Sequence, residues 1–323
     1  MNSFALLMNY KKIIIPTRPH ADVIVGIFLL IKFGEAKYPG IKDSLIDIWQ
    51  ELPAGDTNLS LEKKGVLLLD LGEGKLDHHK TGKNLSQLIA EDLGIVADAS
   101  IAKILAYAER DDKHGLGTVS ADSLDKAFGL SGLVSALNKT IKDPEKIVKI
   151  VLPLLEAHHA EEKRRTQELP QEFEQKLKEG KAEVFEVKQG KKNLKVVVLE
   201  SDNLSMAGWL KSSGGLKADV VCQKNGDGFT NILTKSLKMV DLRWLAAYLR
   251  KAEAELRNRK LTCSTYDLMK PGKIQEIPEW YYDRATNSVL NGGASPKGIL
   301  PTAITLETIK NILKEALSQD SPR

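Results

Sequence analysis

Short apolar runs alternate with longer apolar stretches in the first half of the chain. Lys11–Pro16 and Gly65–Leu69 are rich in β-branched and aliphatic residues, which favour extended backbone, and they predict strands. The longer apolar stretch Val23–Phe33 lies between them and predicts a buried helix that ends near Gly34. Continuous apolar strands separated by helices are typical of a parallel sheet covered on both faces. The first half therefore predicts an α/β domain.

Helical spacing of apolar residues continues into the middle of the chain. The predicted helices are Ser86–Leu93, Ala99–Glu109, Asp122–Phe128, Ser131–Asn138 and Pro144–Leu155. From Glu156 to Gly180 the sequence becomes rich in charge, which predicts an exposed helical connector. Two histidines of this connector, His158 and His159, are expected to be exposed and uninvolved in function.

The second half has the pattern of an α+β domain. Its predicted strands are Ala182–Val187, Leu194–Glu200, Ala218–Gln223 and Phe229–Lys235. An Asn-Gly-Asp-Gly turn joins the last two and predicts a hairpin, so we expect an antiparallel sheet. Helical spacing predicts one helix over 242–256 and a final helix over 305–317. The chain thus divides into three predicted parts: an α/β domain over 1–155, a helical connector over 156–180 and a smaller α+β domain over 181–323.

Composition narrows the class of protein. The 323 residues are 42% hydrophobic and 28% charged, which is ordinary for a globular protein and excludes disordered and collagen-like chains. Cys222 and Cys263 fit no disulfide framework or zinc spacing, which favours a reducing, cytoplasmic compartment. The most apolar run is too short to span a bilayer, so no membrane is expected among the partners. The net charge of +4 is compatible with a phosphate-bearing ligand and does not by itself indicate nucleic acid.

Acidic and imidazole side chains follow the second predicted strand. Asp70 comes directly after Gly65–Leu69, and Asp77-His78-His79 follows a short loop with two glycines. The carboxyl ends of parallel strands are where open α/β sheets bind ligands. Carboxylates and imidazoles can hold a divalent metal such as Mn²⁺. An Asp after a strand can instead cap a turn, and paired histidines often lie on a surface, but together at this position they favour a metal site.

These residues resemble the motifs of the DHH phosphoesterase superfamily, which is named for the triplet found here as Asp77–His79. The chain most resembles the melanocyte-proliferating-gene type of metal-dependent exonuclease. Pro19–Asp22 fits the Phe-His-x-Asp core of that family's first motif, and Asp70–Gly72 fits its Asp-Val-Gly segment. The resemblance covers most of the chain. It implies a parallel-sheet catalytic domain, a connector helix and a smaller C-terminal domain with a Gly-rich motif that binds substrate.

The resemblance also implies roles for individual residues. One Mn²⁺, or Mg²⁺ in its place, would be bound by four ligands: Asp22, Asp70, His78 and either Asp111 or Asp112. Asp70 would bridge to a second ion, which His20 would ligate. His79 would contact the substrate phosphate, and Asp77 would orient the histidines. The ions would activate a water molecule for attack on phosphorus.

The sequence departs from the family pattern at one point. Members usually carry a further histidine shortly before the first motif, and residues 13–19 contain none. His114 could replace it, or a single ion could be bound, and both alternatives stay open. Of the two neighbouring acids, Asp112 is slightly favoured as the ligand. Additional positive charge could come from three nearby residues: Lys80, Arg110 and Lys113.

Two features of the second half could bind substrate. Gly292 and Gly293, followed by Ser295 and Lys297, resemble the Gly-rich motif, because glycine lets the backbone approach a phosphate. An ordinary turn before a helix is an equally good interpretation. The stretch over 235–260 has eight basic and three acidic residues, with aromatic side chains that could stack on bases. A solvated basic face with its aromatic residues in the core is slightly favoured.

The sequence therefore predicts a divalent-metal-dependent phosphohydrolase. Its expected activity is that of a phosphodiesterase or exonuclease on short or single-stranded nucleic acid, held between the two domains. One alternative is hydrolysis of a small phosphate compound, such as a cyclic dinucleotide, nucleoside bisphosphate or pyrophosphate. Another is a non-catalytic nucleotide- or RNA-binding protein with an impaired metal site. A homodimer is compatible with the sequence.

Overall fold

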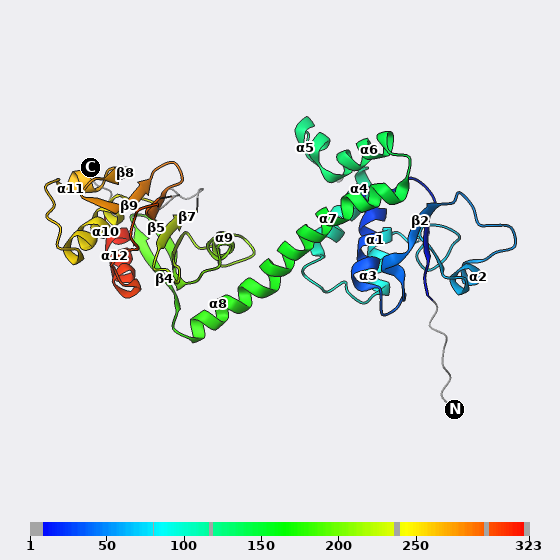
Figure 1. Cartoon of the computed structure of the whole chain (residues 1–323), viewed down its shortest axis with the longest axis horizontal. Helices are drawn as coiled ribbons and strands as arrows, with labels where there is room; N and C mark the ends of the chain where they lie inside the picture. The colour runs from blue at the N-terminus through cyan, green and yellow to red at the C-terminus, as the bar shows by residue number, and fades with distance from the viewer. Residues whose placement is uncertain (1–8, 80, 116–118, 236–239, 294–296, 320–323) are drawn as a thin grey trace, which may run out of the picture. The chain divides into compact units, whose positions relative to one another are not determined.

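The computed structural model describes residues 9–79, 81–115, 119–235, 240–293 and 297–319 (Figure 1). Contacts within the chain divide it into two compact units, Met1–Arg164 and Arg165–Arg323. The boundary falls inside the predicted helical connector. Each unit has its own sheet and its own hydrophobic core.

The first unit contains a parallel sheet of three strands in the order β2-β1-β3. Its strands are β1 (Lys12–Ile15), β2 (Leu45–Ile48) and β3 (Val66–Leu68). The two strands predicted in this half and their parallel arrangement are confirmed. The sequence analysis did not predict β2, since this short strand exposes Leu45 and includes the polar Asp47.

Helices cover both faces of this sheet. They are α1 (Ala21–Phe33), α2 (Asn58–Lys63), α3 (Leu85–Asp92), α4 (Ala102–His114), α5 (Ser123–Phe128), α6 (Leu130–Thr140) and α7 (Pro144–Lys163), with a 3-10 turn at Ile41–Asp43. Ile13 and Ile15 face the large core around α1, while Ile14 faces the smaller cluster beneath α2. Gly26 lets α1 approach α3 closely, because a Cβ at this position would lie 2.8 Å from Cδ1 of Ile89. The buried helix predicted over Val23–Phe33 is confirmed as α1.

Helix α4 is longer than predicted. The pattern placed its end at Glu109, but the helix continues to His114 and ends at Gly115, whose φ is +73°. The last turns contain no apolar residue after Ala108, so the periodicity stops before the helix does. Asp111 and Asp112 consequently lie on a helix, and their side chains point in different directions.

The predicted connector is helical as far as Lys178. Helix α7 leads into a π-helical segment (Arg164–Glu168) and then into α8 (Leu169–Lys178). The prediction that His159 is exposed was wrong. Its side chain is buried, Nε2 lies 3.0 Å from Oγ of Ser100, and its ring contacts Phe28 and Phe33 edge-on. His158 is exposed, as expected.

The second unit is built on a mixed sheet of seven strands in the order β4-β5-β6-β7-β10-β9-β8. The strands are β4 (Ala182–Gln189), β5 (Lys192–Glu200), β6 (Val220–Lys224), β7 (Thr230–Thr234), β8 (Gly272–Ile274), β9 (Ile277–Asp283) and β10 (Ser288–Asn291). The hairpin β6–β7 is confirmed. The prediction of an antiparallel sheet was wrong for one pair of strands. β5 and β6 pair in parallel and are joined by a crossover that contains a helix.

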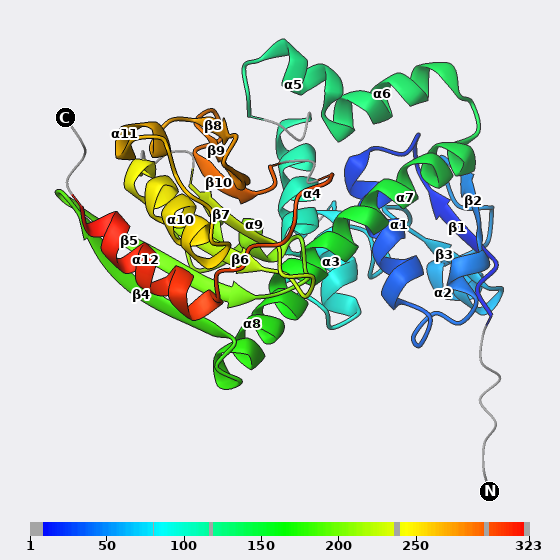
Figure 2. The same cartoon turned by 60° about the vertical axis from the view of Figure 1, so that its left-hand side comes forward.

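Helices pack on both faces of the second sheet. They are α8 together with α9 (Met206–Lys211), α10 (Arg243–Leu256), α11 (Thr265–Leu268) and α12 (Leu306–Ser318). Figure 2 shows α10 and α12 lying against one face. Val196 and Val198 of β5 face the core beneath α10 and α12, whereas Val197 and Leu199 face α8 and α9.

Several arginines of the basic stretch over 235–260 are engaged in internal contacts. Arg250 is fully buried, and Arg257 and Arg259 pair with Glu253 and Glu279. The two aromatic residues of α10 are partly buried against the core. These contacts support the structural interpretation of the stretch over one in nucleic-acid binding.

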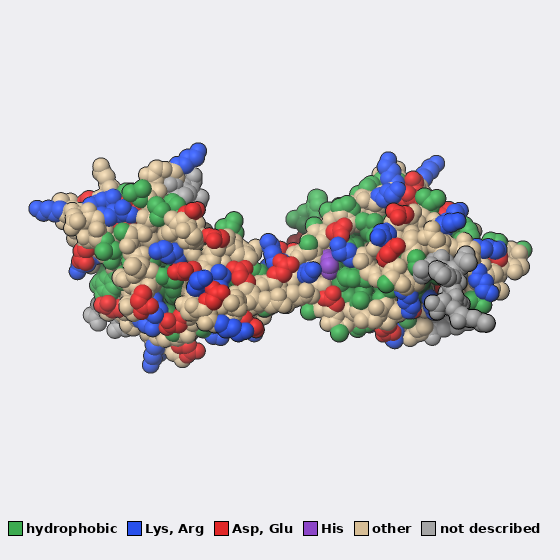
Figure 3. All heavy atoms as spheres, turned by 60° about the horizontal axis from the view of Figure 1, so that its bottom comes forward, with side chains coloured by type: hydrophobic (Ala, Val, Ile, Leu, Met, Phe, Trp, Pro, Cys, Tyr) green, Lys and Arg blue, Asp and Glu red, His purple; other side chains and the backbone are tan. Residues whose placement is uncertain are grey.

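The surface carries both signs of charge. Figure 3 shows Lys, Arg, Asp and Glu side chains interspersed over the visible face of each unit. Among the described residues, no helix has the length and apolar character needed to cross a membrane.

Candidate metal centre

The loop after β3 folds back on itself and presents the first acid of the site. Asp70 has a φ of +52°, a left-handed conformation that Asp and Asn adopt more readily than most residues other than glycine. Its backbone N–H donates to the carbonyl oxygen of Leu76 at 2.9 Å, which closes the loop. Asp70 therefore lies beside the Asp-His-His triplet that ends the loop.

Asp70 holds His78. Nδ1 of His78 lies 2.6 Å from Oδ1 of Asp70, and the backbone N–H of His78 donates to the same oxygen at 3.3 Å. The Asp70 carboxylate is buried, and this burial raises its pKa despite the opposing effect of His78. The other ring nitrogen of His78, Nε2, lies 3.9 Å from Oδ1 of Asp112 on α4. His78 is thus flanked by two carboxylates from separate segments.

Asp77 holds His79 in a similar way. Oδ1 of Asp77 lies 2.6 Å from Nδ1 of His79, and Oδ2 accepts a hydrogen bond from the backbone N–H of Glu73. The His78 and His79 rings stack, with their centroids 4.8 Å apart and their planes inclined by 8°. The hydrogen bond to Asp77 raises the pKa of His79, whose side chain is 63% exposed. Among the described contacts, Asp77 orients His79, while Asp70 orients His78.

His20 and Asp111 form the other side of the site. His20 directly precedes α1, and its Nδ1 lies 3.9 Å from Oδ2 of the buried Asp111. Burial opposes protonation of His20, but the nearby carboxylates of Asp111, Asp22 and Asp70 outweigh this effect and raise its pKa. The charges of Asp70 and Asp112 similarly raise the pKa of His79. The structure therefore brings the predicted acids and histidines of the first unit into one electrostatic cluster.

Asp22 has a structural role in this cluster. Its carboxylate is fully buried, and it accepts backbone hydrogen bonds from Leu85 to Oδ2 at 3.0 Å and from Ser86 to Oδ1 at 3.1 Å. These N–H groups begin α3, so Asp22 joins the start of α1 to the start of α3. Burial raises its pKa despite these hydrogen bonds. Each carboxylate oxygen keeps a second lone pair, so a role as a metal ligand would be shared with α3.

The arrangement fits a divalent metal. Asp70, His78 and His79 offer ligand atoms that all lie within 4.8 Å of one another. Metal–ligand bonds of about 2.0–2.2 Å allow two ligands of one ion to be up to about 4.4 Å apart, so this group of three would have to close slightly around an ion. The 3.9 Å separations of His78 from Asp112 and of His20 from Asp111 lie within that limit. Imidazole and carboxylate donors suit ions such as Mn²⁺ and Zn²⁺.

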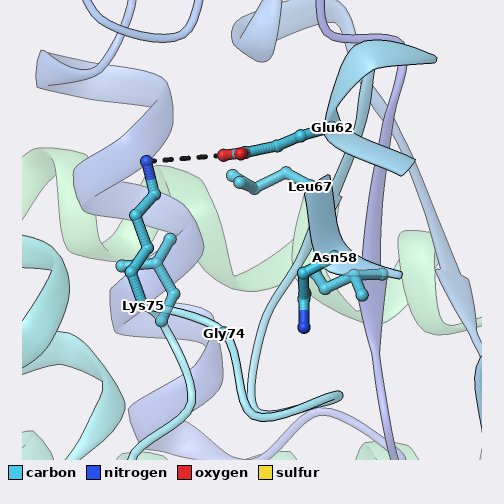
Figure 4. Close-up of a pocket in the computed structure, with 7 residues that line it drawn as sticks. Asn58, Glu62, Leu67, Gly74 and Lys75 are labelled. Atoms are coloured by element: carbon cyan, nitrogen blue, oxygen red, sulfur yellow. Dashed lines mark ion pairs between the residues drawn. The ribbon is translucent and has the colours of Figure 1, made fainter. Parts of the chain in front are cut away.

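Helix α2 supports the loop that carries Asp70 and Asp77. Nδ2 of Asn58 donates to the carbonyl oxygen of Gly72, and a Cβ added at Gly74 would lie 2.8 Å from Oδ1 of Asn58. Figure 4 shows Lys75 of the loop directed toward Glu62 of α2, with 3.4 Å between their charged atoms. These contacts surround a small pocket of about 40 Å³. A side chain at position 74 would displace the amide of Asn58, so glycine suits this close packing.

Several predicted residues are not brought to the cluster by the described contacts. Arg110 and His114 are exposed on α4, and Lys113 pairs with Glu109. Gly292 and Gly293 belong to the second unit, where both have positive φ, of +83° and +79°. Exposed Lys297 belongs to the same unit. Their role in substrate binding stays a prediction, while Lys80 and Ser295 lie outside the described residues.

The sequence analysis missed two residues beside Asp111. The hydroxyl of Ser131 donates to Oδ1 of Asp111, and the Tyr107 hydroxyl lies 2.9 Å from Oγ of Ser131. Tyr107 is four residues before Asp111 on α4, so helical spacing could have paired them. Ser131 lies in the first turn of a different helix, α6, and no local pattern signals its contact with Asp111.

The charge coupling of His79 can be measured directly. In Asp77→Asn, the neutral amide no longer favours the imidazolium, so we expect the pKa of His79 to fall toward its ordinary value of 6.5. In the wild type, the stabilisation from this pair is fully present below pH 6.5 and is lost as the pH rises through the raised pKa. An NMR titration of the metal-free protein measures this midpoint. His20, whose pKa is raised by Asp111, Asp22 and Asp70, is the internal control, and an unchanged His79 midpoint would contradict the coupling.

Comparisons with known proteins identify no family for this chain. No protein-family model matches it, and no curated protein matches it. One solved structure that does match is that of an uncharacterized protein from Helicobacter pylori G27. The two sequences are 11% identical, the match covers 95% of this chain and 99% of the other, and the TM-score is 0.22. At that TM-score the match supports no conclusion about fold or function.

Proposed function

We propose that this chain is a divalent-metal-dependent phosphohydrolase that cleaves phosphodiester bonds in short or single-stranded nucleic acid. The observation that carries the proposal is the position of His78. It lies between Asp70 and Asp112, 2.6 Å and 3.9 Å from its two ring nitrogens, and stacks on His79. A second imidazole–carboxylate pair, His20 and Asp111, belongs to the same electrostatic cluster. This concentration of metal-binding groups follows the carboxyl ends of β1 and β3.

The residues of the cluster would have different roles in binding metal and phosphate. Asp70, His78 and Asp112 would hold the first ion, and His20 with Asp70 would face a second. Bound divalent metal would acidify water and neutralise charge that develops on the phosphate oxygens. Exposed His79, kept protonated to higher pH by Asp77, would bind a phosphate oxygen. Asp77 would fix the ring of His79, which lowers the entropy cost of binding.

The choice of nucleic acid as substrate rests on the resemblance to the DHH superfamily. The Gly292–Gly293 turn and Lys297 are proposed to hold the far end of the substrate, since a left-handed glycine backbone can approach a phosphate closely. Two free cysteines, Cys222 and Cys263, support a cytoplasmic location. A small phosphate compound would require the same metal cluster and is tested as an alternative substrate.

A second candidate function is nucleotide or RNA binding without catalysis. The observation that favours it is the state of Asp22, whose two oxygens both accept backbone hydrogen bonds in a fully buried position. The absence of a histidine from residues 13–19 points in the same direction. If Asp22 supplies no ligand, the first ion loses one protein contact. Without a histidine in residues 13–19 the second ion has few protein contacts, so turnover is impaired.

The full chain, stripped of metal with a chelator, should be assayed with added Mn²⁺. Labelled short RNA, single-stranded DNA, cyclic dinucleotides, nucleoside bisphosphates and pyrophosphate are the substrates. We expect Mn²⁺-dependent cleavage of the short nucleic acids, blocked by chelator and restored by excess Mn²⁺. His158→Gln, which removes an exposed histidine of α7, is the control and should match the wild type. Turnover of only a small phosphate compound would select the alternative substrate class, and no turnover with retained RNA binding would select the binding protein.

A further inference from the structure

Two hydroxyl groups form a short chain behind Asp111. The Tyr107 hydroxyl lies 2.9 Å from both the backbone nitrogen and Oγ of Ser131, and the Ser131 hydroxyl donates to Oδ1 of Asp111. Ser131 and Asp111 are buried. The chain joins the start of α6 to the last turns of α4.

The direction of every hydrogen bond in this chain is fixed. The backbone N–H of Ser131 can only donate, so it donates to the Tyr107 oxygen. An ionised carboxylate can only accept, so the Ser131 hydroxyl proton points to Asp111. The Tyr107 proton therefore has one remaining acceptor in the chain, Oγ of Ser131.

These contacts fix which oxygen of Asp111 faces the cluster. Ser131 occupies Oδ1, and Oδ2 is the oxygen that lies 3.9 Å from Nδ1 of His20. Asp112, the next residue on α4, faces His78 instead. The two neighbouring acids consequently serve different histidines.

We propose that Tyr107 and Ser131 are positioning residues for the metal centre, acting in series through Asp111 on the ring of His20. The inference rests on the proposed function, since it assigns these residues a role in binding the metal. An imidazole whose second nitrogen is held by an oriented carboxylate binds a metal more tightly, because the ring does not have to be ordered during binding. The proposal also gives Asp111 the task of orienting His20 and leaves Asp112 as the acid that ligates the ion beside His78.

The surroundings of Tyr107 suit a substitution by phenylalanine, which removes only the hydroxyl group. Its ring lines an apolar cavity of about 420 Å³, together with Ile104, Leu133 and Leu154. Tyr107→Phe keeps the ring against these side chains and removes only the hydroxyl. A matched control is Tyr38→Phe, which removes a buried hydroxyl that donates to Asp92 at 2.5 Å in the same unit.

The test measures Mn²⁺ affinity of the metal-free full chain, by the paramagnetic resonance of free Mn²⁺ during a titration. We expect Tyr107→Phe and Ser131→Ala each to weaken binding about 10-fold, the lower end of the range for residues that orient metal ligands. Because the two residues act in series, the double variant should also lose about 10-fold rather than 100-fold. Ser131→Thr keeps a hydroxyl and should restore binding, and Tyr38→Phe should bind like the wild type.

Four results would overturn the proposal. If Tyr107→Phe and Ser131→Ala bind Mn²⁺ with wild-type affinity, the two hydroxyl groups do not position the metal centre. The proposed function would still stand. Losses that multiply in the double variant, or an equal loss in Tyr38→Phe, would show that the effect is not transmitted in series or is only a loss of stability. Absence of saturable Mn²⁺ binding to the wild type would overturn the proposed function and this inference together.

Discussion

Replacing Asp70 with asparagine should abolish metal-dependent hydrolysis while the fold is retained. The amide has no charge to offer an ion, and a ligand should matter at least as much as the orienting residues whose loss costs 10–100-fold, so we expect activity to fall by about 100-fold or more. Asparagine tolerates the left-handed backbone at this position, where φ is +52°, and its oxygen can still accept a hydrogen bond from His78.

Asp70→Asn should also affect the thermal stability of the metal-free protein. Burial raises the pKa of Asp70 in the folded protein, so its stabilising contribution is present below the unfolded pKa and is lost as the pH rises through the folded pKa. At neutral pH the buried charge therefore costs stability, and metal-free Asp70→Asn should unfold at the same temperature as the wild type or higher. Asp125→Asn, an identical change at an exposed position on α5, is the control for activity. Full activity in Asp70→Asn would exclude Asp70 as a ligand.

Replacing Arg250 with methionine should destabilise the second unit by about 3 kcal/mol. The fully buried guanidinium donates hydrogen bonds to four carbonyl oxygens, those of Leu268, Lys270, Gly272 and Trp280. Each buried acceptor left without a donor costs about 1–3 kcal/mol, and relief from burying a charge offsets part of the sum. Burial lowers the pKa of Arg250 to about 10, although the nearby Cys263 opposes this effect.

Denaturant unfolding followed by tryptophan fluorescence measures this effect. Three of the four tryptophans belong to the second unit, namely Trp209, Trp244 and Trp280, so the signal reports mainly on its unfolding. Lys251→Met changes the exposed neighbour on α10 and should shift stability by less than about 0.5 kcal/mol. Equal unfolding midpoints for the two variants would contradict the structural role of Arg250.

The sequence was informative where apolar residues run together. β1, α1 and β3 were predicted closely, because their side chains are almost all buried and leave a continuous pattern. β9 was missed because it contains Pro278, a residue that argues against a strand interior. The buried Arg250 was also hidden, since arginine is usually exposed and no local pattern signals four distant carbonyl partners.

The candidate site was also predicted from the sequence only in part. Motif order linked His20, Asp70 and His78, and the structure places their charges in one cluster, although β2, α2 and two loops intervene in the chain. The sequence could not reveal that Asp22 is engaged with the start of α3, nor that Ser131 holds Asp111. These contacts join segments that are 20 or more residues apart, and they depend on how the helices pack.

The most direct test of the proposed metal centre is a Mn²⁺ titration of the full metal-free chain, with the number of bound ions counted. We predict saturable binding of one or two ions per chain in the wild type, and its loss in Asp70→Asn, because Asp70 belongs to the His78 pair and is coupled to His20. A count of one ion would match the missing histidine among residues 13–19. No saturable binding, or equal binding by the wild type and Asp70→Asn, would contradict the metal centre.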